Sequence, residues 1–313
     1  MTAMDPLAAA PFTPQDLVRM RMEGISEEKA LAQLEIFRHG SVFARLEKAC
    51  AVNDGIVRLS RTEMDSLSAL YAAAVVQGRV MQFVPASGAA TRLFKGLIAV
   101  LGRADSPAFS VLAKEAGSQP DAKEFLDFFM GLPLFPFKDG LAESMHRSGL
   151  DFQTLYDAKD YRPILEHLLL PKGLGFADRP KALIPFHRYN GGTRTALEEH
   201  LVEAAALARD SRGVSRIHFT VSGEHEAEIQ ALLDNARGKF EAAGTRLVIG
   251  LSRQKSSTNT LAVDMDGRPL READGSLVFR PGGHGALLEN LRQTGGDIVF
   301  IKNIEEFHEA CVP

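Results

Sequence analysis

Cysteine is scarce in this chain, whose 313 residues include only Cys50 and Cys311. Such sparse use excludes a disulfide-dense scaffold and favours a reducing compartment. The spacing of the two cysteines also fits no zinc-binding motif, and Cys311 stands two residues from the end of the sequence. We therefore expect neither cysteine to have a functional role.

Long apolar runs are lacking as well. The stretch LYAAAVV, residues 70–76, is far too short to span a bilayer. The N-terminus, MTAMDPLAAAPF, has no basic region and no long apolar stretch, so its pattern is not that of a signal peptide. We therefore expect no membrane partner and predict a cytoplasmic location.

Neither sign of charge dominates the sequence. The formal net charge is -4, which gives no indication of a nucleic-acid partner or of a membrane-surface protein. Hydrophobic residues make up 45% and charged residues 24%, as is ordinary for a soluble globular protein. Any anionic ligand must therefore be held by a local cationic site. The Walker A pattern and the protein-kinase signatures are also absent.

The sequence does contain a helical N-terminal region, residues 1–79. Helices are indicated at 13–24, 26–40 and 60–78, with Thr13 and Ser26 as N-caps. Residues from about 104 to 179 also show mostly helical patterns, joined by connectors rich in proline and glycine.

Strands alternate with helices in the rest of the chain. We expect strands at 80–86, 181–186, 214–222, 245–252 and 297–303, and two or three short strands within 259–280. The alternation predicts an α/β fold with a mostly parallel twisted sheet and helices on both faces. It divides the chain into the helical region 1–79 and an α/β domain, 80–313, with a helical insertion at about 104–179.

A loop of small residues follows the first predicted strand. In an open α/β sheet, ligands bind beyond the carboxyl ends of the strands. Small side chains let backbone N–H groups approach a ligand, and the N-terminus of the following helix favours a phosphate. The candidate phosphate-binding residues are Ala86, Ser87, Gly88, Ala89, Ala90 and Thr91, with Arg92 as a bidentate donor. The alternative is a tight turn with a surface arginine.

Polar or glycine-rich segments follow the other predicted strands. Lys181 opens the segment KALIPF, and Gln254 and Lys255 follow the strand at 245–252. The loop RPGGHGALLENL contains Gly282, Gly283, His284 and Gly285, so it bares its backbone around one histidine. Thr220 to His225, at the end of the strand at 214–222, could line the same edge.

Acidic residues follow the last predicted strand. Asn303, Glu305 and Glu306 stand at its end, and carboxylates facing a phosphate site suggest Mg²⁺ coordination. Asp264 and Asp266 are rivals, although the segment DMDG is more typical of a hairpin turn. His218 and His225 lie on different elements, so we do not expect them to form a metal pair.

Four of these segments, in order, resemble motifs of sugar-nucleotide pyrophosphorylases of the UDP-sugar type. ASGAATR is similar to their AGGQGTR loop, and PKALIP to their PK-x-x-x-P element. RPGGHGALLENL resembles their PPGHG loop, and IVFIKNIEE their strand ending in N-x-DN. Together they span roughly residues 80–306. The whole chain also resembles an uncharacterised bacterial family catalogued as a domain of unknown function.

The resemblance implies a GT-A or Rossmann-like nucleotidyltransferase that joins a nucleoside triphosphate to a sugar 1-phosphate or similar phosphate. By position, residues 87–91 would cradle the nucleotide, Arg92 would hold the leaving pyrophosphate, and Lys181 would neutralise phosphate charge. Gly282 to Gly285, with Gln254 and Lys255 nearby, would contact base or sugar. Asn303 and Glu305 would lie near Mg²⁺. The implied partners are small molecules.

Some positions depart from the family pattern. Ser87 and Ala90 replace glycines, and Glu305 replaces an aspartate. The chain also stops about ten residues after the last predicted strand, whereas this branch usually continues. The resemblance thus leaves two alternatives, a truncated chain or a protein that binds a nucleotide without turnover. A protein-binding scaffold and a phosphotransferase are two further alternatives from other functional classes.

Overall fold

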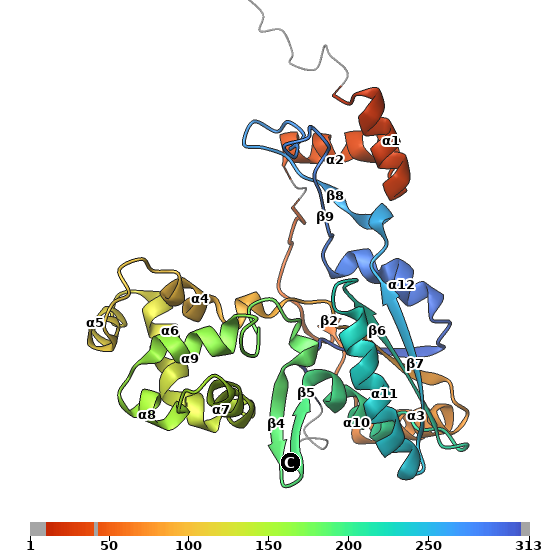
Figure 1. Ribbon diagram of the computed structural model, residues 1–313. Coiled ribbons are helices and arrows are strands. Elements are labelled where there is room, and N and C mark those ends of the chain that lie inside the picture. Colours follow the sequence, from red (N-terminus) through yellow and green to blue (C-terminus); the bar gives the residue numbers. More distant parts are fainter. Residues whose placement is uncertain (1–10, 41–42, 308–313) are drawn as a thin grey trace, which may run out of the picture. The chain divides into compact units, whose positions relative to one another are not determined.

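The structure is a computed structural model, and it describes residues 11–40 and 43–307 (Figure 1). The chain forms two compact units. The first unit comprises Met1–Ala73 and Arg253–Gly295, and the second comprises Ala74–Ser252 and Gly296–Pro313. The sequence pattern places residues 253–295 in the α/β domain, whereas in the structure this segment groups with the N-terminal part of the chain.

The first unit is built around two helices, α1 (Pro14–Glu23) and α2 (Glu27–His39). Thr13 and Ser26 cap them as predicted, and Thr13 forms a capping box with Asp16. Buried side chains of this helix pair form a small core with two residues from the C-terminal part of the chain. The core consists of Phe12, Met20, Ile25, Ala30, Leu34, Leu261 and Leu277.

The remaining elements of the first unit are short. They are β1 (Ala51–Val52), β2 (Gly55–Ile56), β8 (Thr260–Leu261), β9 (Phe279–Arg280), the 3-10 helices η4 (Ser256–Thr258) and η5 (His284–Leu287), and α12 (Leu288–Gln293). The strands β8 and β9 pair antiparallel, as expected for the 259–280 region. Cys50 is exposed and free, whereas Cys311 lies outside the described residues.

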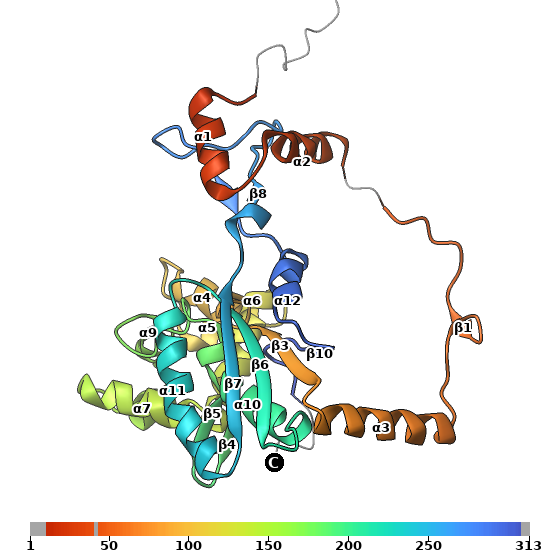
Figure 2. The same cartoon turned by 90° about the vertical axis from the view of Figure 1, so that its right-hand side faces the viewer.

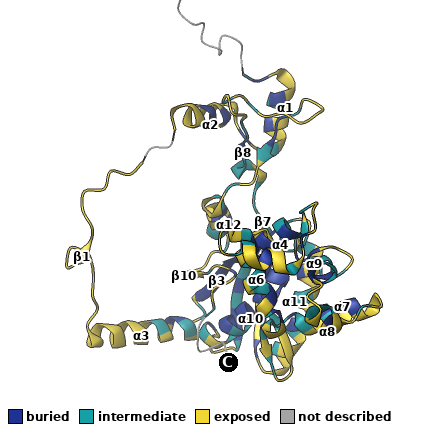
Figure 3. Cartoon of the chain, turned by 90° about the vertical axis from the view of Figure 1, so that its left-hand side faces the viewer, coloured by how far each residue is buried: buried dark blue, intermediate teal, exposed yellow. Residues whose placement is uncertain are grey.

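The helix α3 (Arg61–Val76) ends in the second unit, where β3 follows. Most of its residues are exposed, and only Ala74 is buried (Figure 3).

The second unit contains a four-stranded sheet in the order β10-β3-β6-β7 (Figure 2). The strands are β3 (Val80–Pro85), β6 (Val214–Val221), β7 (Arg246–Arg253) and β10 (Ile298–Ile301). The central strand β3 is buried along its whole length and pairs parallel with both β10 and β6. The prediction of an α/β fold with a parallel sheet is therefore confirmed.

Two helices, α10 (Ala196–Leu207) and α11 (Glu226–Ala242), pack against one face of this sheet. Their buried side chains meet Val84, Ile217, Phe219 and Leu247 from the strands. Residues 80, 82 and 84 of β3 point to one face and 81, 83 and 85 to the other, because side chains alternate along a strand. On the second face, the rings of Phe83 and His218 stack 5.5 Å apart.

The predicted helical region between β3 and β4 forms a lobe of short helices (Figure 1). These are α4 (Lys95–Leu101), α5 (Phe109–Glu115), α6 (Pro120–Gly131), α7 (Lys138–Arg147), α8 (Phe152–Asp157) and α9 (Tyr161–Leu169). Their apolar faces share one core, rich in phenylalanine. Among the described residues, none of the chain's helices combines the length and apolar character that crossing a membrane requires.

One local prediction was wrong. KALIPF is not one strand, because Lys181–Leu183 forms a 3-10 turn, η3, and β4 (Pro185–Tyr189) begins only afterwards. Proline at position 185 lacks the N–H that an interior ladder position would donate, so the strand begins there. The small-residue turn after β3 is followed by a helix as predicted, with the 3-10 turn η1 (Ala90–Arg92) before α4.

Candidate functional site

The small-residue loop after β3 is fixed to the segment that carries Lys181. The backbone N–H of Lys181 donates to the carbonyl of Gly88 at 3.0 Å, and that of Ala90 donates to Arg179 at 3.1 Å. At the start of the loop, Ala86 donates to Thr220 of β6 at 2.8 Å. Segments about ninety residues apart in sequence therefore lie side by side at the carboxyl end of β3.

The loop itself is largely open to solvent. Ser87, Gly88 and Ala89 are exposed, and so are Thr91 and Arg92, whereas Ala86 and Ala90 are buried. The two buried alanines anchor the ends of the exposed stretch. The α-helix α4 begins only at Lys95, after the 3-10 turn at Ala90–Arg92, so the loop does not lead directly into an α-helix.

Lys181 and Glu305 form an ion pair at this edge. The Nζ atom of Lys181 donates to Oε1 of Glu305 at 2.7 Å. The lysine side chain is only 10% exposed, whereas that of Glu305 is 42% exposed. Burial raises the pKa of the Glu305 carboxyl, but the hydrogen bond and charge of Lys181, with the charge of Arg92, outweigh it and lower the pKa. We call Arg92, Lys181 and Glu305 the strand-end cluster.

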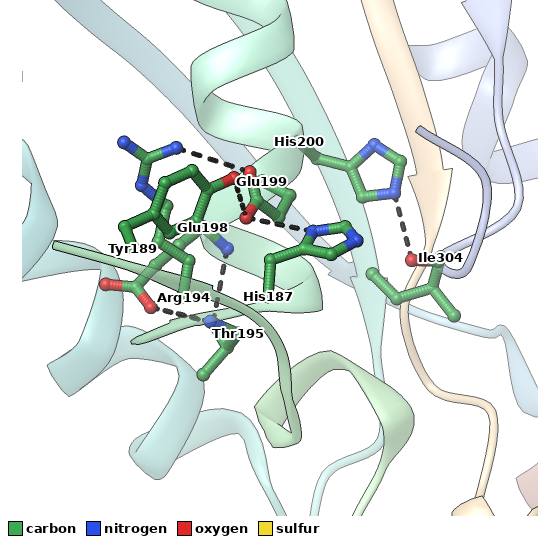
Figure 4. Close-up of polar contacts among 8 residues, drawn as sticks. All are labelled: His187, Tyr189, Arg194, Thr195, Glu198, Glu199, His200 and Ile304. Atoms are coloured by element: carbon green, nitrogen blue, oxygen red, sulfur yellow. Dashed lines mark hydrogen bonds and ion pairs between the residues drawn. The ribbon is translucent and has the colours of Figure 1, made fainter. Parts of the chain in front are cut away.

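The turn that carries Glu305 is anchored on α10. The ring Nε2 of the buried His200 lies 3.1 Å from the carbonyl of Ile304, the residue before Glu305 (Figure 4). Next to it, Nζ of Lys302 donates to Oε1 of Glu203 at 2.8 Å. Burial raises the pKa of Glu203, but His200 and Lys302 lower it overall. These contacts fix the backbone on both sides of the turn.

The neighbouring residue on α10, Glu199, holds the hairpin of β4 and β5 (Gly192–Thr195). Its buried carboxylate accepts from the Tyr189 hydroxyl at 2.6 Å and lies 3.1 Å from His187 Nδ1 (Figure 4). Arg194 lies 3.5 Å from the same carboxylate. Burial, followed by the contact with Glu199, raises the pKa of Tyr189 to about 12. The sequence analysis did not identify Glu199 and its contacts, nor His200. The reason is that His187, Glu199 and His200 form no recognisable motif.

Two buried hydroxyls lie at the carboxyl end of β6. Within the described part of the chain, Thr220 Oγ1 and Ser222 Oγ have no hydrogen-bond partner. Thr220 pairs in register with Pro85 at the end of β3. This pairing places the start of the predicted Thr220–His225 segment at the same sheet edge as the loop. Unpaired buried hydroxyls are costly unless a ligand or water satisfies them.

The predicted base- or sugar-binding residues lie in the first unit. The side-chain amide of Gln254 faces the backbone of Gly282, with its two polar atoms 2.9 Å from the N–H nitrogen and 3.2 Å from the carbonyl oxygen. Lys255 is paired with Glu289 at 2.9 Å. A Cβ on Gly282 would lie 3.0 Å from Ala286 Cβ, so only glycine fits there comfortably. Gly283, His284 and Gly285 are exposed.

The predicted metal ligands are only partly brought together. Asn303 donates to Glu306 at 2.8 Å, while Glu305 faces Lys181. Among residues 11–40 and 43–307, no group of three or more His, Cys, Asp and Glu side chains could hold a metal ion. Glu305 is thus the carboxylate of the strand-end cluster, and a single carboxylate does not make an all-protein magnesium cage.

The chain has distant likenesses among known proteins. No curated protein matches it. One solved structure does, the uridine diphosphate N-acetylglucosamine pyrophosphorylase from Trypanosoma brucei in complex with inhibitor, at 16% identity and a TM-score of 0.37. The match covers 82% of this chain and 37% of that enzyme. A family match extends over residues 13–310, and the chain belongs to the family described as domain of unknown function (DUF4301).

Proposed function

We propose that the protein is a nucleotidyltransferase that joins a nucleoside triphosphate to a sugar 1-phosphate or a similar small phosphate and releases pyrophosphate. The observation that carries the proposal is the pairing of the Gly88–Ala90 loop with Arg179–Lys181. It gathers Arg92 and Lys181 beside an open loop of small residues, at the sheet edge where α/β proteins bind ligands.

The reaction needs positioning and charge neutralisation more than a covalent nucleophile. An oxygen of the acceptor phosphate attacks the α-phosphorus, the bond from that phosphorus to the bridging oxygen breaks, and pyrophosphate leaves. In the proposal, the exposed Arg92 binds the phosphates that leave, and the buried Lys181 neutralises charge at the α-phosphate. Glu305 holds the Lys181 ammonium in place before substrate binds.

Magnesium fits this proposal in a limited role. When bound to the triphosphate, Mg²⁺ would supply charge neutralisation between phosphate oxygens. Glu305 is the carboxylate of the cluster that could contact it, with Asn303 as a neighbouring amide. The Lys181–Glu305 contact would then have to loosen as the nucleotide enters.

A pyrophosphate-release assay tests the proposal. The full chain is incubated with each of the four common nucleoside triphosphates, Mg²⁺ and a panel of sugar 1-phosphates and other phosphate monoesters. We expect release that requires both the nucleotide and one acceptor. Release without an acceptor indicates simple hydrolysis, and no release with any pair would refute the transferase assignment.

Nucleotide binding without turnover is the second candidate. It is favoured by the ion pair itself, because Glu305 already compensates the charge of Lys181 and leaves Arg92 as the exposed cation of the cluster. This candidate predicts that nucleoside triphosphates raise the melting temperature by mass action, without releasing pyrophosphate. A thermal shift without any product in the assay above would select it.

A further inference from the structure

An apolar pocket of about 250 Å³ lies in the second unit, between the helical lobe and the segment that follows Lys181. Its walls are formed by nine side chains, none of them polar. They are Leu93, Phe94, Phe128, Phe135, Pro136, Phe137, Ile184, Pro185 and Phe186.

The pocket adjoins the strand-end cluster along two segments of the chain. Leu93 directly follows Arg92, and Ile184 stands three residues after Lys181. The same two segments are joined by the hydrogen bond from the Lys181 N–H to Gly88. A molecule whose phosphate contacts Lys181 would therefore have the pocket within its reach.

The walls of the pocket are preformed. The rings of Phe128 and Phe135 stack at 4.8 Å, and those of Phe135 and Phe137 stack at 5.1 Å with planes 8° apart. Phe94 and Ile184 are buried in the lobe's core. Since these rings support one another, the pocket does not need a ligand to shape it.

The size and polarity of the pocket limit which chemical groups it can hold. Complete ligand pockets usually measure about 300–1,000 Å³, so this one suits a single group of a ligand rather than all of it. Sugar hydroxyls and the polar edges of a nucleobase would find no side-chain partner there, and burying them unpaired is costly. A hydrocarbon group, such as an aryl ring or a short alkyl chain, would be favoured instead.

We propose that this pocket holds the hydrocarbon group of a phosphorylated acceptor whose attacking phosphate is bound by Lys181. The proposal rests on the proposed function and narrows its acceptor from any small phosphate to an amphipathic phosphate monoester. Leu93, which lines the pocket and is 42% exposed, would contact the hydrocarbon group of such a ligand.

Calorimetric titration of the full chain with methyl phosphate and phenyl phosphate tests the proposal. The two probes carry the same charged group and differ in the hydrocarbon part. We expect phenyl phosphate to bind on the order of tenfold more tightly, because it buries more apolar surface. Leu93→Gln should remove most of this preference. Leu170→Gln is the control, since Leu170 is 39% exposed in the same unit but does not line the pocket.

Lys181→Met separates this inference from the proposed function. If both probes lose affinity in Lys181→Met but bind the wild type equally well, the phosphate role stands and the pocket inference is overturned. If phenyl phosphate binding depends on Leu93 but not on Lys181, the pocket binds hydrocarbon without the phosphate site, and both proposals fail. If the control Leu170→Gln loses the preference for phenyl phosphate to the same extent as Leu93→Gln, the proposed role of the pocket is overturned.

Discussion

Lys181 and Glu305, 124 residues apart in sequence, meet at 2.7 Å through Nζ and Oε1. The contact joins the segment that is hydrogen-bonded to the small-residue loop to the turn after β10, so two predicted site segments share one ion pair. Before any ligand binds, Glu305 compensates the charge of the most buried cation of the strand-end cluster.

A double-mutant cycle with Lys181→Met and Glu305→Gln measures this relationship. Lys181→Met keeps the buried aliphatic stem, and the freed carboxylate is exposed enough to be hydrated. We therefore expect a coupling free energy of unfolding on the order of 1 kcal/mol, typical of a pair with one partly exposed member. Urea unfolding of the four proteins at neutral pH gives the value. Strictly additive losses would show that the pair contributes no stability.

The same pair predicts a pH dependence. Glu305 has a pKa lowered from its ordinary 4.5, so its contribution to stability is fully present above pH 4.5. The contribution is lost as the pH falls below that value and through the lowered pKa of the folded state. The stability difference between wild type and Glu305→Gln should therefore narrow between neutral pH and pH 3. A gap that widens on acidification would contradict the assigned direction of the shift.

Arg92→Ala separates ligand binding from folding. Arg92 is exposed, and loss of a charge-assisted contact to phosphate costs about 1.5–3 kcal/mol. We expect affinity for a nucleoside triphosphate to fall roughly 10- to 100-fold while the melting temperature stays unchanged. Arg147→Ala, which removes an exposed arginine on α7 of the same unit, is the control and should bind normally. Equal losses in both variants would point to net charge rather than to a site.

Lys181 differs from Arg92 in a way that its sequence context did not reveal. A lysine after a proline at the start of a predicted strand is typical of a surface position. Lys181 is nevertheless buried, since only 8% of the whole residue is exposed. Its burial follows from the 3-10 turn at 181–183, which turns the side chain inward toward the β10 end. A substitution of Lys181 therefore affects the packing of the fold as well as the site. Methionine is used in the double-mutant cycle because it keeps the buried aliphatic stem.

Periodicity and capping signals predicted the long helices and the central strands. Thr13, Ser26 and the six buried residues of β3 are local signals, and the structure confirms each of them. The pairing of Gly88 with Lys181 and the anchoring of the Glu305 turn by His200 are set by tertiary packing. No local pattern marks such contacts, so the sequence could suggest which segments form the edge but not how they are held.

The ion pair of Asp16 and Arg271 predicts that the stability of the first unit falls at acidic pH. Two hydrogen bonds, of 2.7 and 2.8 Å, join them, and the hydrogen bonds to Arg271 are the main cause that lowers the pKa of Asp16 to about 2. Asp16→Asn should cost on the order of 2 kcal/mol at pH 7, an effect that shrinks as the pH falls from 3.8 toward 2. Hydrogen exchange of peptides from α1, measured in urea, reports this loss of stability. Asp266→Asn, at an exposed position, should change little.

The glycine loop of the first unit offers a last test of the proposed base or sugar contact. A Cβ on Gly283 meets no atom within 4 Å, and its φ of -69° suits any residue. Gly283→Val should therefore leave the melting temperature unchanged while lowering nucleotide affinity about tenfold or more, because the side chain would occupy the bare backbone surface. Isothermal titration with nucleoside triphosphates measures the affinity.

Gly282→Val is the contrasting variant, since a side chain there meets Ala286 Cβ at 3.0 Å and the Thr258 carbonyl at 3.1 Å. It should lower the stability of the first unit as well as any affinity, because well-packed neighbours must shift. If Gly283→Val binds nucleotide as the wild type does and Gly282→Val loses only stability, the loop is a structural turn. The base and sugar contacts must then come from other residues.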